Sequence, residues 1–316
     1  MAAGAADRRR EKTEALIISI KKERKIAMKT IVITGATSGI GLETARILCR
    51  QGFRVLGVGH SEKNCELAKG DLLSGNPEAQ LTYLSADLMQ QHEVLRVANE
   101  LTAYINENCG GELYALINNA GCARNWYMTT DEGYEQQFAL NYLAGFLLSH
   151  ELLPLLLKSR GRVLMTGSES HKGIKVHWND VMFRRGYNPL TAYKQSKLCD
   201  ILFAKGLNDR YSADGLRAYV LDPGLVHTEI GSKAAGGIGG VVWALRKRHG
   251  VEPSVPAETY AFLCNPEREP QGLYYHLCEE NTYSKEVTRE NADRLFALSE
   301  RLCGIRYESS SKGAIA

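Results

Sequence analysis

Tyr193 and Lys197 stand four residues apart in a segment, 193–211, whose pattern predicts a helix. A spacing of four places both side chains on one helix face, one turn apart. A phenol has a reference pKa of about 10 and is a poor base at neutral pH, but a nearby ammonium group favours the phenolate. The pair could therefore pass a proton to or from a substrate. The same spacing also occurs by chance on helix surfaces, so the pair needs support from elsewhere in the chain.

A glycine-rich turn, Thr34–Gly41, supplies that support. It reads Thr-Gly-Ala-Thr-Ser-Gly-Ile-Gly, and its three glycines would let a diphosphate approach bare backbone. The N-terminus of the helix that follows would add free N–H groups and a positive dipole. Taken alone, the segment fits a simple tight turn equally well. Its position between a predicted strand, 30–34, and a predicted helix, 39–50, favours a dinucleotide site.

The elements that must hold these two groups alternate along the chain between strand and helix patterns. Short β-branched or apolar runs predict strands, and longer segments between them predict helices. Strands that are apolar at nearly every position suit a parallel sheet covered by helices on both faces. We therefore predict an α/β fold with a single doubly wound, Rossmann-like domain. The predicted strands are 30–34, 54–58, 81–85, 115–118, 162–166 and 217–221, and the predicted helices are 39–50, 92–107, 135–157 and 193–211.

The predicted domain runs from about residue 28 to 305, because no linker or repeat divides the chain. Residues 1–27 hold eight Lys or Arg against four Asp or Glu, a net charge of +4. This basic extension is either loosely packed or disordered, or a helix that binds a membrane surface or a partner. Residues 306–316 are expected to form a C-terminal tail. Five glycines between 231 and 240 precede a short amphipathic stretch, and they predict a mobile flap at about 231–256.

Composition argues against several classes of function. The whole chain has a formal charge of +3, so the residues after 27 are close to neutral and give no electrostatic case for nucleic acid. The eight cysteines form no CxxC pair, which argues against a metal site or a disulfide scaffold and favours reduced thiols in a cytoplasmic protein. The apolar run 15–20 is far shorter than the ~20 residues that span a bilayer, so we expect no membrane span.

The glycine turn, the segment Asn118–Gly121 and the Tyr193–Lys197 pair together resemble the short-chain dehydrogenase/reductase family over residues 30–305. The resemblance implies a nicotinamide cofactor on the turn, an Asn-Asn-Ala-Gly segment that steadies the central sheet, and an acid, Asp87, that faces the adenine. The residues that we assign to the cofactor are Gly35, Thr37, Ser38, Gly39, Ile40, Gly41, His60, Asp87, Leu88, Asn119, Ala120, Gly121, Tyr193, Lys197, Pro223, Gly224, Val226 and Thr228.

The choice between NAD(H) and NADP(H) depends on the end of the second strand. An NAD site usually has an acid about 20 residues beyond the glycines, where it binds the ribose hydroxyls. Counting from Gly41 reaches Gly59, His60 and Ser61, none of which is a carboxylate. Nothing at these positions repels a 2′-phosphate, so we expect NADP(H) rather than NAD(H). Histidine is mostly neutral near pH 7, so Lys63 is expected to help His60.

The resemblance also implies catalytic roles. Tyr193 is the general acid and base, Lys197 supports it, and Ser168, 25 residues before the tyrosine, hydrogen-bonds the substrate oxygen. Ser170 is an alternative to Ser168, since glycine stands at 167, where the family commonly has serine. Asn141 is either a hydrogen-bonded core residue or a helix kink, or, as in the family, the residue that holds a water linking Lys197 to solvent.

Two further stretches, 170–180 and 272–304, resemble the retinol dehydrogenase-like branch of the family. This resemblance implies a lipophilic alcohol and its aldehyde or ketone as the substrate pair, and family members often form homodimers through helices like 135–157 and 193–211. Two alternatives stay open: a double-bond reductase, because 192–199 also resembles protochlorophyllide reductase, and a non-catalytic nucleotide-binding scaffold. Five residues between the serine and the tyrosine either line the substrate entrance or form a polar surface loop: His171, His177, Trp178, Arg184 and Arg185.

Overall fold

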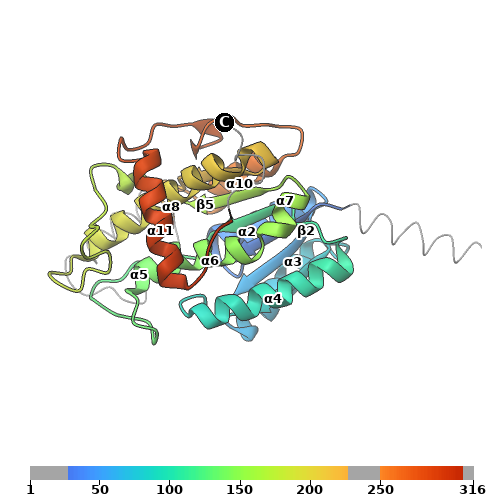
Figure 1. The fold of residues 1–316 in the computed structure, drawn as a ribbon. Helices are drawn as coiled ribbons and strands as arrows, with labels where there is room; N and C mark the ends of the chain where they lie inside the picture. Colours follow the sequence, from blue (N-terminus) through green and yellow to red (C-terminus); the bar gives the residue numbers. More distant parts are fainter. Residues whose placement is uncertain (1–27, 227–249, 309–316) are drawn as a thin grey trace, which may run out of the picture.

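The computed structural model describes residues 28–226 and 250–308. They form an α/β domain around an eight-stranded sheet with the order β3-β2-β1-β4-β5-β6-β7-β8 (Figure 1). Neighbouring strands pair in parallel except for β7 and β8, which form an antiparallel hairpin. The strand order changes direction between β1 and β4, as in other doubly wound folds. The predicted fold class is therefore confirmed, with one antiparallel strand added at the edge.

The six predicted strands are all present, and two short ones follow them. Every residue of β1, β2 and β4 is buried, as expected for strands covered on both faces. The edge strand β3 is only partly buried. The strands are β1 Thr30–Thr34, β2 Arg54–Gly59, β3 Leu81–Ser85, β4 Ala115–Asn118, β5 Arg162–Thr166, β6 Arg217–Leu221, β7 Tyr274–His276 and β8 Glu279–Glu280.

The helices pack in two layers, and the side chains of β1 alternate between them. Ile31 and Ile33 face a core shared with α2 and α10, while Val32 faces the larger core under α4, α6 and α8. α11 packs against α8. The helices are α2 Gly39–Arg50, α3 Glu62–Gly75, α4 Gln91–Asn108, α5 Gln136–Phe138, α6 Ala144–Glu151, α7 Leu153–Lys158, α8 Pro189–Tyr211, α10 Ser254–Cys264 and α11 Arg289–Cys303, with short turns η1 Ala139–Leu143, η2 Glu169–His171 and η3 Ser212–Asp214.

The single helix predicted over 135–157 is divided in the structure. A π-helical turn, η1, joins the short α5 to α6, and Leu152 separates α6 from α7. Pro154 lies in the first turn of α7, where its missing N–H costs nothing, so it starts a new helix instead of continuing α6. The π turn carries Asn141, and π turns inside helices are often found at functional sites.

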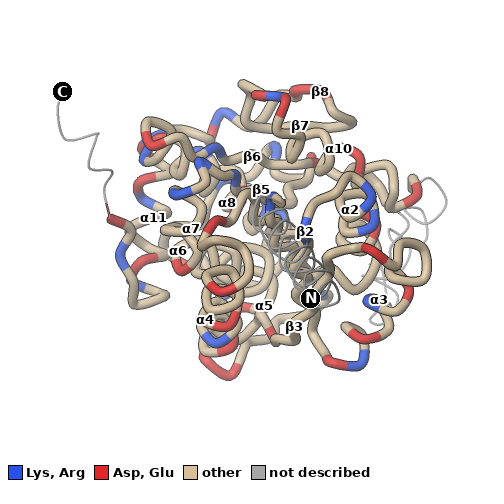
Figure 2. Tube along the Cα trace, turned by 90° about the vertical axis from the view of Figure 1, so that its right-hand side faces the viewer, with Lys and Arg blue, Asp and Glu red and all other residues tan. Residues whose placement is uncertain are grey.

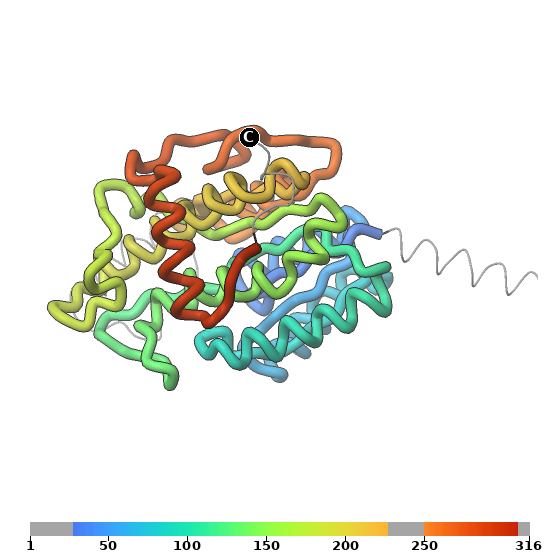
Figure 3. The backbone as a smooth tube through the Cα atoms, viewed as in Figure 1, coloured from blue at the N-terminus to red at the C-terminus, as the bar shows by residue number. Residues whose placement is uncertain are grey.

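A cluster of aromatic side chains joins the C-terminal part of the chain to the core. Phe146 of α6, Phe203 of α8 and Phe296 of α11 have ring centroids 5.2, 5.3 and 5.5 Å apart. Tyr307 closes the cluster at 5.0 Å from Phe146 and donates to the Phe146 carbonyl oxygen. Figure 3 shows α11 (red) crossing α8 (yellow). The C-terminal helix and Tyr307 therefore cover part of the helix that carries Tyr193.

Acidic and basic segments are interspersed over the face in Figure 2. Within 28–226 and 250–308, no helix combines the length and apolarity needed to cross a bilayer. All eight cysteines lie in these ranges, and all are free thiols. Three predicted segments fall wholly or mostly outside the described residues: the extension 1–27, the flap and the C-terminal tail.

Candidate active site

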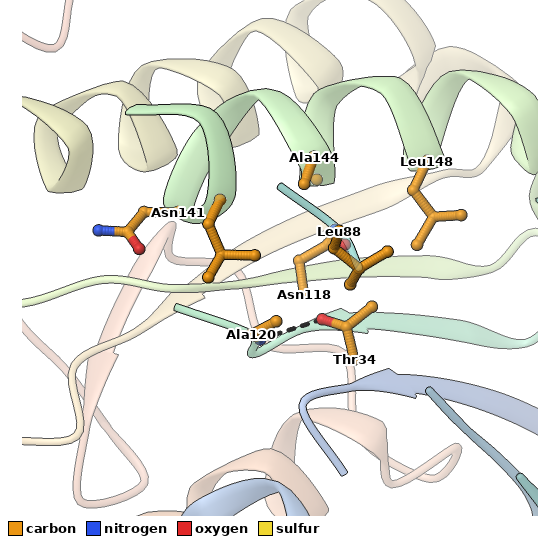
Figure 4. Close-up of a pocket in the computed structure, with 9 residues that line it drawn as sticks. Thr34, Leu88, Asn118, Ala120, Asn141, Ala144 and Leu148 are labelled. Carbon is orange, nitrogen blue, oxygen red and sulfur yellow. Dashed lines mark hydrogen bonds between the residues drawn. The ribbon is translucent and has the colours of Figure 1, made fainter. Parts of the chain in front are cut away.

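The site lies at the carboxyl ends of the paired central strands β1 and β4, where the strand order changes direction. A pocket at this point is lined by Thr34 and Asn118 from the two strand ends, by Leu88 and Ala120, and by residues of η1 and α6 (Figure 4). Ligands of doubly wound folds bind in this crevice. The Oδ1 atom of Asn118 is buried without a hydrogen-bond partner among the described residues. Leu88 and Ala120, both assigned to the cofactor from the sequence, therefore come together here.

The glycine turn forms a cradle that side chains would fill. Gly39 begins α2 with a φ of +54°, in the left-handed region that favours glycine. A Cβ atom at Gly41 would lie 2.2 Å from the carbonyl oxygen of Gly35, so a side chain does not fit there. Ser38 precedes α2 and makes no side-chain capping bond to its first N–H groups. These features fit the binding of a diphosphate at the start of α2.

Asn119 fastens the glycine turn to the neighbouring strand. Its Nδ2 donates to the carbonyl oxygens of Thr34 and Gly35 at 3.1 and 3.3 Å. In return, the Thr34 hydroxyl accepts from the N–H groups of Asn119 and Ala120, each at 3.0 Å. Figure 4 shows the bond from Ala120. These four bonds join β1 to β4 beside the cradle. They are the contacts expected of a segment that steadies the central sheet.

His60 and Asp87 lie together at the carboxyl ends of β2 and β3. Nδ1 of His60 is 3.6 Å from a carboxylate oxygen of Asp87, and the His60 side chain is 75% exposed. Thr37 of the glycine turn packs against β2, where its Cγ2 would lie 2.4 Å from a Cβ atom at Gly59. The structure thus brings together the histidine and the acid that the sequence assigned to the adenosine side, and the imidazole is open to a ligand.

Local sequence signals start α8 at the position that the site needs. The side chain of Asn188 accepts a hydrogen bond from the N–H of Thr191, at 2.9 Å, as an N-cap residue does. Pro189 follows in the first turn, where a missing N–H costs nothing. Tyr193 lies one turn further on and is partly exposed. Beyond it, from 195 to 204, nearly every residue is buried, so the helix passes through the interior.

Lys197 is held beside Tyr193 by two acceptors. The lysine is 5% exposed, and its Nζ lies 5.8 Å from the centroid of the Tyr193 ring. Nζ donates to the carbonyl oxygen of Thr166, at the end of β5, at 2.7 Å. It also donates to a carboxylate oxygen of Asp200 at 3.1 Å. The strand end that leads to Ser168 therefore fixes the ammonium group near the phenol.

Ser168 follows β5 and is fixed by its neighbours. Its Oγ accepts from the Ser170 hydroxyl at 2.9 Å, and its carbonyl oxygen lies 2.6 Å from Nδ1 of His171. Nε2 of His171 accepts from the N–H of Ser284 at 3.1 Å, so the ring hydrogen is on Nδ1 and donates to Ser168. His171 is 0% exposed, and burial lowers its pKa. Neither predicted place for His171, substrate entrance or surface loop, is correct, because packing against Tyr274 buries the ring in the core.

Gly167 is a glycine because its neighbours leave no room for a side chain. A Cβ atom there would lie 2.6 Å from Cγ1 of Val220 and 3.2 Å from Cε2 of Tyr274. The N–H of Gly167 donates to the carbonyl oxygen of Leu221 at 2.7 Å, which holds the backbone close to β6. The tight packing explains why this chain departs from the serine that is common in the family.

Asn141 lies in the π turn with its amide occupied. Nδ2 donates to Oγ of Ser196 and to the carbonyl oxygen of Cys122, both at 3.0 Å, and Oδ1 accepts from the Cys122 N–H at 2.7 Å. The Gly121 backbone passes so close that a Cβ atom would lie 3.2 Å from Oδ1. In Figure 4 the carboxamide points away from the pocket. A water on this side chain would have to use the second lone pair of Oδ1, since both N–H groups are taken.

The Pro223–Val226 segment follows β6 at the other side of the site. Gly224 has a φ of +67°, and its N–H donates to the Asp222 carboxylate at 2.9 Å. Val226 forms a parallel bridge with Val251, just before α10. Thr228, the last residue that the sequence assigned to the cofactor, lies outside the described residues.

Sequence reasoning missed three buried polar groups beside the site. Asp200 contacts Lys197. The spacing of three residues between them on a helix was the signal that could have predicted this contact. His171 holds Ser168, a contact that depends on the distant Ser284. Tyr274 is 0% exposed, and burial followed by the nearby Asp222 raises the pKa of its phenol. Ser284 and His171 lie far apart in sequence, as do Asp222 and Tyr274, so no local pattern predicts that they meet.

Comparisons with known proteins identify one family. The family model described as short chain dehydrogenase matches residues 29–237. Retinol dehydrogenase 13 of Homo sapiens is 31% identical over 294 residues, which cover 89% of this chain and 86% of that protein. Retinol dehydrogenase 14 of Mus musculus is 33% identical over 297 residues, which cover 88% and 86%. A crystal structure of an uncharacterized protein from Mycobacterium paratuberculosis has a TM-score of 0.70 at 27% identity, covering 90% of this chain and 96% of that one.

Proposed function

This chain belongs to the short-chain dehydrogenase family and is an oxidoreductase that acts on CH–OH or C=O groups with a nicotinamide cofactor, and we propose that Tyr193 is its general acid and base. One observation carries the proposal: the buried ammonium of Lys197 is held 5.8 Å from the phenol ring by the end of β5. A positive charge beside the ring stabilises the negative charge that develops on the phenol oxygen while a proton is transferred.

The proposed reaction divides the work between the cofactor and the chain. The nicotinamide, when bound, gives or takes the hydride. Ser168 hydrogen-bonds the substrate oxygen, and Tyr193 gives that oxygen a proton in reduction or removes one in oxidation. Since Ser168 Oγ already accepts from Ser170, its own hydrogen is free for the substrate. Ser170 therefore orients Ser168 in this mechanism and does not replace it. Asn141 holds α8 in place through Ser196.

We also propose that NADP(H) is preferred over NAD(H). The support is the exposed His60 at the end of β2, with Lys63 in the first turn of α3 and no carboxylate at 59–61. Both side chains can donate hydrogen bonds to a 2′-phosphate. An acid at the end of β2, which would bind the ribose hydroxyls and repel that phosphate, is missing.

A lipophilic alcohol and its aldehyde or ketone are the proposed substrates. The relatives named above are retinol dehydrogenases, at 31% and 33% identity. Apolar side chains are exposed near the start of α8. Leu190 lies one turn before Tyr193 at 56% exposure, and Trp126, at 53%, precedes Tyr127, whose ring packs against Tyr187. Such side chains suit an apolar substrate better than a charged one. The eight free thiols support a reducing compartment, and we propose the cytoplasm.

The test follows NADPH and NADH oxidation at 340 nm with aliphatic, aromatic, steroid and retinoid carbonyls, for wild type, Tyr193→Phe and Tyr104→Phe. Loss of the Tyr193 hydroxyl should lower kcat by about 10²–10⁴-fold while NADPH binding is kept. Tyr104→Phe removes a hydroxyl on α4 that accepts from Thr82, and should leave turnover unchanged. Equal turnover by Tyr193→Phe and wild type would refute the catalytic role, and faster turnover with NADH would refute the cofactor preference.

A further inference from the structure

A third ionisable side chain lies behind Tyr193 and Lys197 on the same helix face. Tyr193, Lys197 and Asp200 occupy positions i, i+4 and i+7 of α8, so they follow one stripe of the helix. The side chain of Asp200 is 1% exposed and that of Lys197 is 6% exposed. Asp200 is thus closed to solvent and to any substrate, and it can act on the reaction through Lys197.

The partners of the lysine set the direction of its ammonium group. One N–H donates to the carbonyl oxygen of Thr166 at 2.7 Å, and another donates to Oδ2 of Asp200 at 3.1 Å. An ammonium group has three N–H donors, so one remains for the side of Tyr193. A lysine side chain is flexible and does not keep one position without such contacts. The strand end and the carboxylate together hold it.

Stability does not explain this buried pair. Oδ1 of Asp200 is buried without a hydrogen-bond partner among the described residues. A buried ion pair is often no more stable than apolar side chains of the same volume, because the cost of desolvation offsets the attraction between the charges. The contact with Lys197 offers a functional explanation instead.

The other titratable groups near the pair are neutral. Tyr142 of η1 is hydrogen-bonded to Ser299, and Tyr260 of α10 is hydrogen-bonded to Thr166. Burial raises the pKa of both phenols, and the charge of Asp200 raises it further. Burial also raises the pKa of two nearby thiols, Cys199 beside Asp200 and Cys122 beside Lys197. Lys197 is therefore the one cation that faces Asp200 within the residues that the structure describes.

We propose that Asp200 is a positioning residue of this active site, which keeps Lys197 protonated and directed at Tyr193 while the phenol loses and regains its proton. The inference rests on the proposed function of Tyr193. Burial alone would lower the pKa of Lys197, but Asp200 and Tyr193 more than offset it, and the pKa is raised. Burial raises the pKa of Asp200 to about 7, so the carboxyl is largely neutral at pH 6 and anionic at pH 9. The effect of Asp200 should therefore grow over that range.

The test measures kcat and KM for oxidation of all-trans-retinol with NADP⁺ from pH 6 to pH 10, in wild type, Asp200→Asn and Asp209→Asn. Asparagine keeps the size of the side chain and removes its charge. We expect kcat of Asp200→Asn to stay within roughly threefold of wild type at pH 6 and to fall at least about tenfold below it at pH 9, because the buried lysine then loses its proton earlier. Asp209→Asn breaks the more exposed Lys205–Asp209 pair of the same helix, at 2.6 Å, and should follow wild type at every pH.

A loss of kcat that is equal at pH 6 and pH 9, or no loss at all, overturns the inference, because a merely structural role has no such pH dependence. If Asp200→Asn fails to fold, the test is instead a pH titration of the Lys197 ε-carbon in wild type, followed by NMR. The signal is assigned by its absence from the spectrum of Lys197→Met. A titration midpoint at or above pH 10 supports the inference, and a lower one overturns it. Wild type that does not oxidise retinol counts against the proposed function, and the NMR titration then decides this inference alone.

Discussion

Replacement of Gly167 by alanine tests whether the packing behind Ser168 holds in place the serine that we propose to bind the substrate oxygen. The new Cβ atom would lie 2.6 Å from Cγ1 of Val220, about 1 Å inside the optimal contact distance. Overpacking of this kind costs about 1–3 kcal/mol of unfolding free energy. Because Ser168 is the next residue, the shift that relieves the clash should also misplace its hydroxyl and lower kcat by roughly 10–100-fold.

A double-mutant cycle makes the argument quantitative. Val220→Ala removes the clashing methyl group and should cost about 2 kcal/mol by itself. In the double variant each change relieves the other. The losses of unfolding free energy in the two single variants should therefore sum to at least about 1 kcal/mol more than the loss in the double variant. Urea unfolding measures the free energies, and Gly70→Ala is the control. Gly70 is an exposed residue of α3, and a Cβ atom there has nothing within 4 Å. Alanine at this position should raise the unfolding free energy by about 0.5–1 kcal/mol. Strict additivity in the cycle, or unchanged kcat in Gly167→Ala, would refute the reasoning.

Two other predictions concern stability. Burial lowers the pKa of His171, so this residue binds a proton more readily in the unfolded chain than in the native protein. The unfolding free energy should therefore fall as the pH drops from 7 to 5, and urea unfolding should show a smaller fall for His171→Gln; identical pH slopes would contradict this. The turn between β7 and β8 consists of Leu277 and Cys278, with φ of +50° and +64°. Asparagine tolerates that conformation better than leucine, so Leu277→Asn should raise the unfolding free energy by about 1 kcal/mol, and a thermal midpoint that falls would argue against strain in this turn.

The sequence predicts the sheet well because its strands are short and buried at nearly every position. β1 and β5 have the expected bounds, and the glycine turn follows β1 as predicted. The break between α6 and α7 was harder to predict, because the apolar pattern continues through it. Pro154, in the first turn of α7, was the available signal. Asn141, in the π turn, contacts Cys122 and Ser196, and both lie too far away in sequence for a local pattern to predict these bonds.

The candidate site was predictable where its motifs are local. The spacing of Tyr193 and Lys197 places them on one helix face in any context. The position of the Lys197 ammonium group depends on residues outside this motif, because it donates hydrogen bonds to Thr166 and Asp200. In the sequence Asp200 resembles a surface charge that pairs with a lysine one turn away. Only the packing of α8 inside the domain shows that the pair is buried.

The aromatic cluster around Tyr307 has a consequence for synthesis of the protein on the ribosome. α8 is complete at Tyr211, yet Phe296 and Tyr307, which cover Phe203, are made about 100 residues later. At a translation rate of about 5–20 residues per second, the nascent chain exposes that apolar face for roughly 5–20 seconds. Exposed apolar surface of this kind is what chaperones protect, and a ribosome that stalls before residue 296 leaves the helix that carries Tyr193 uncovered.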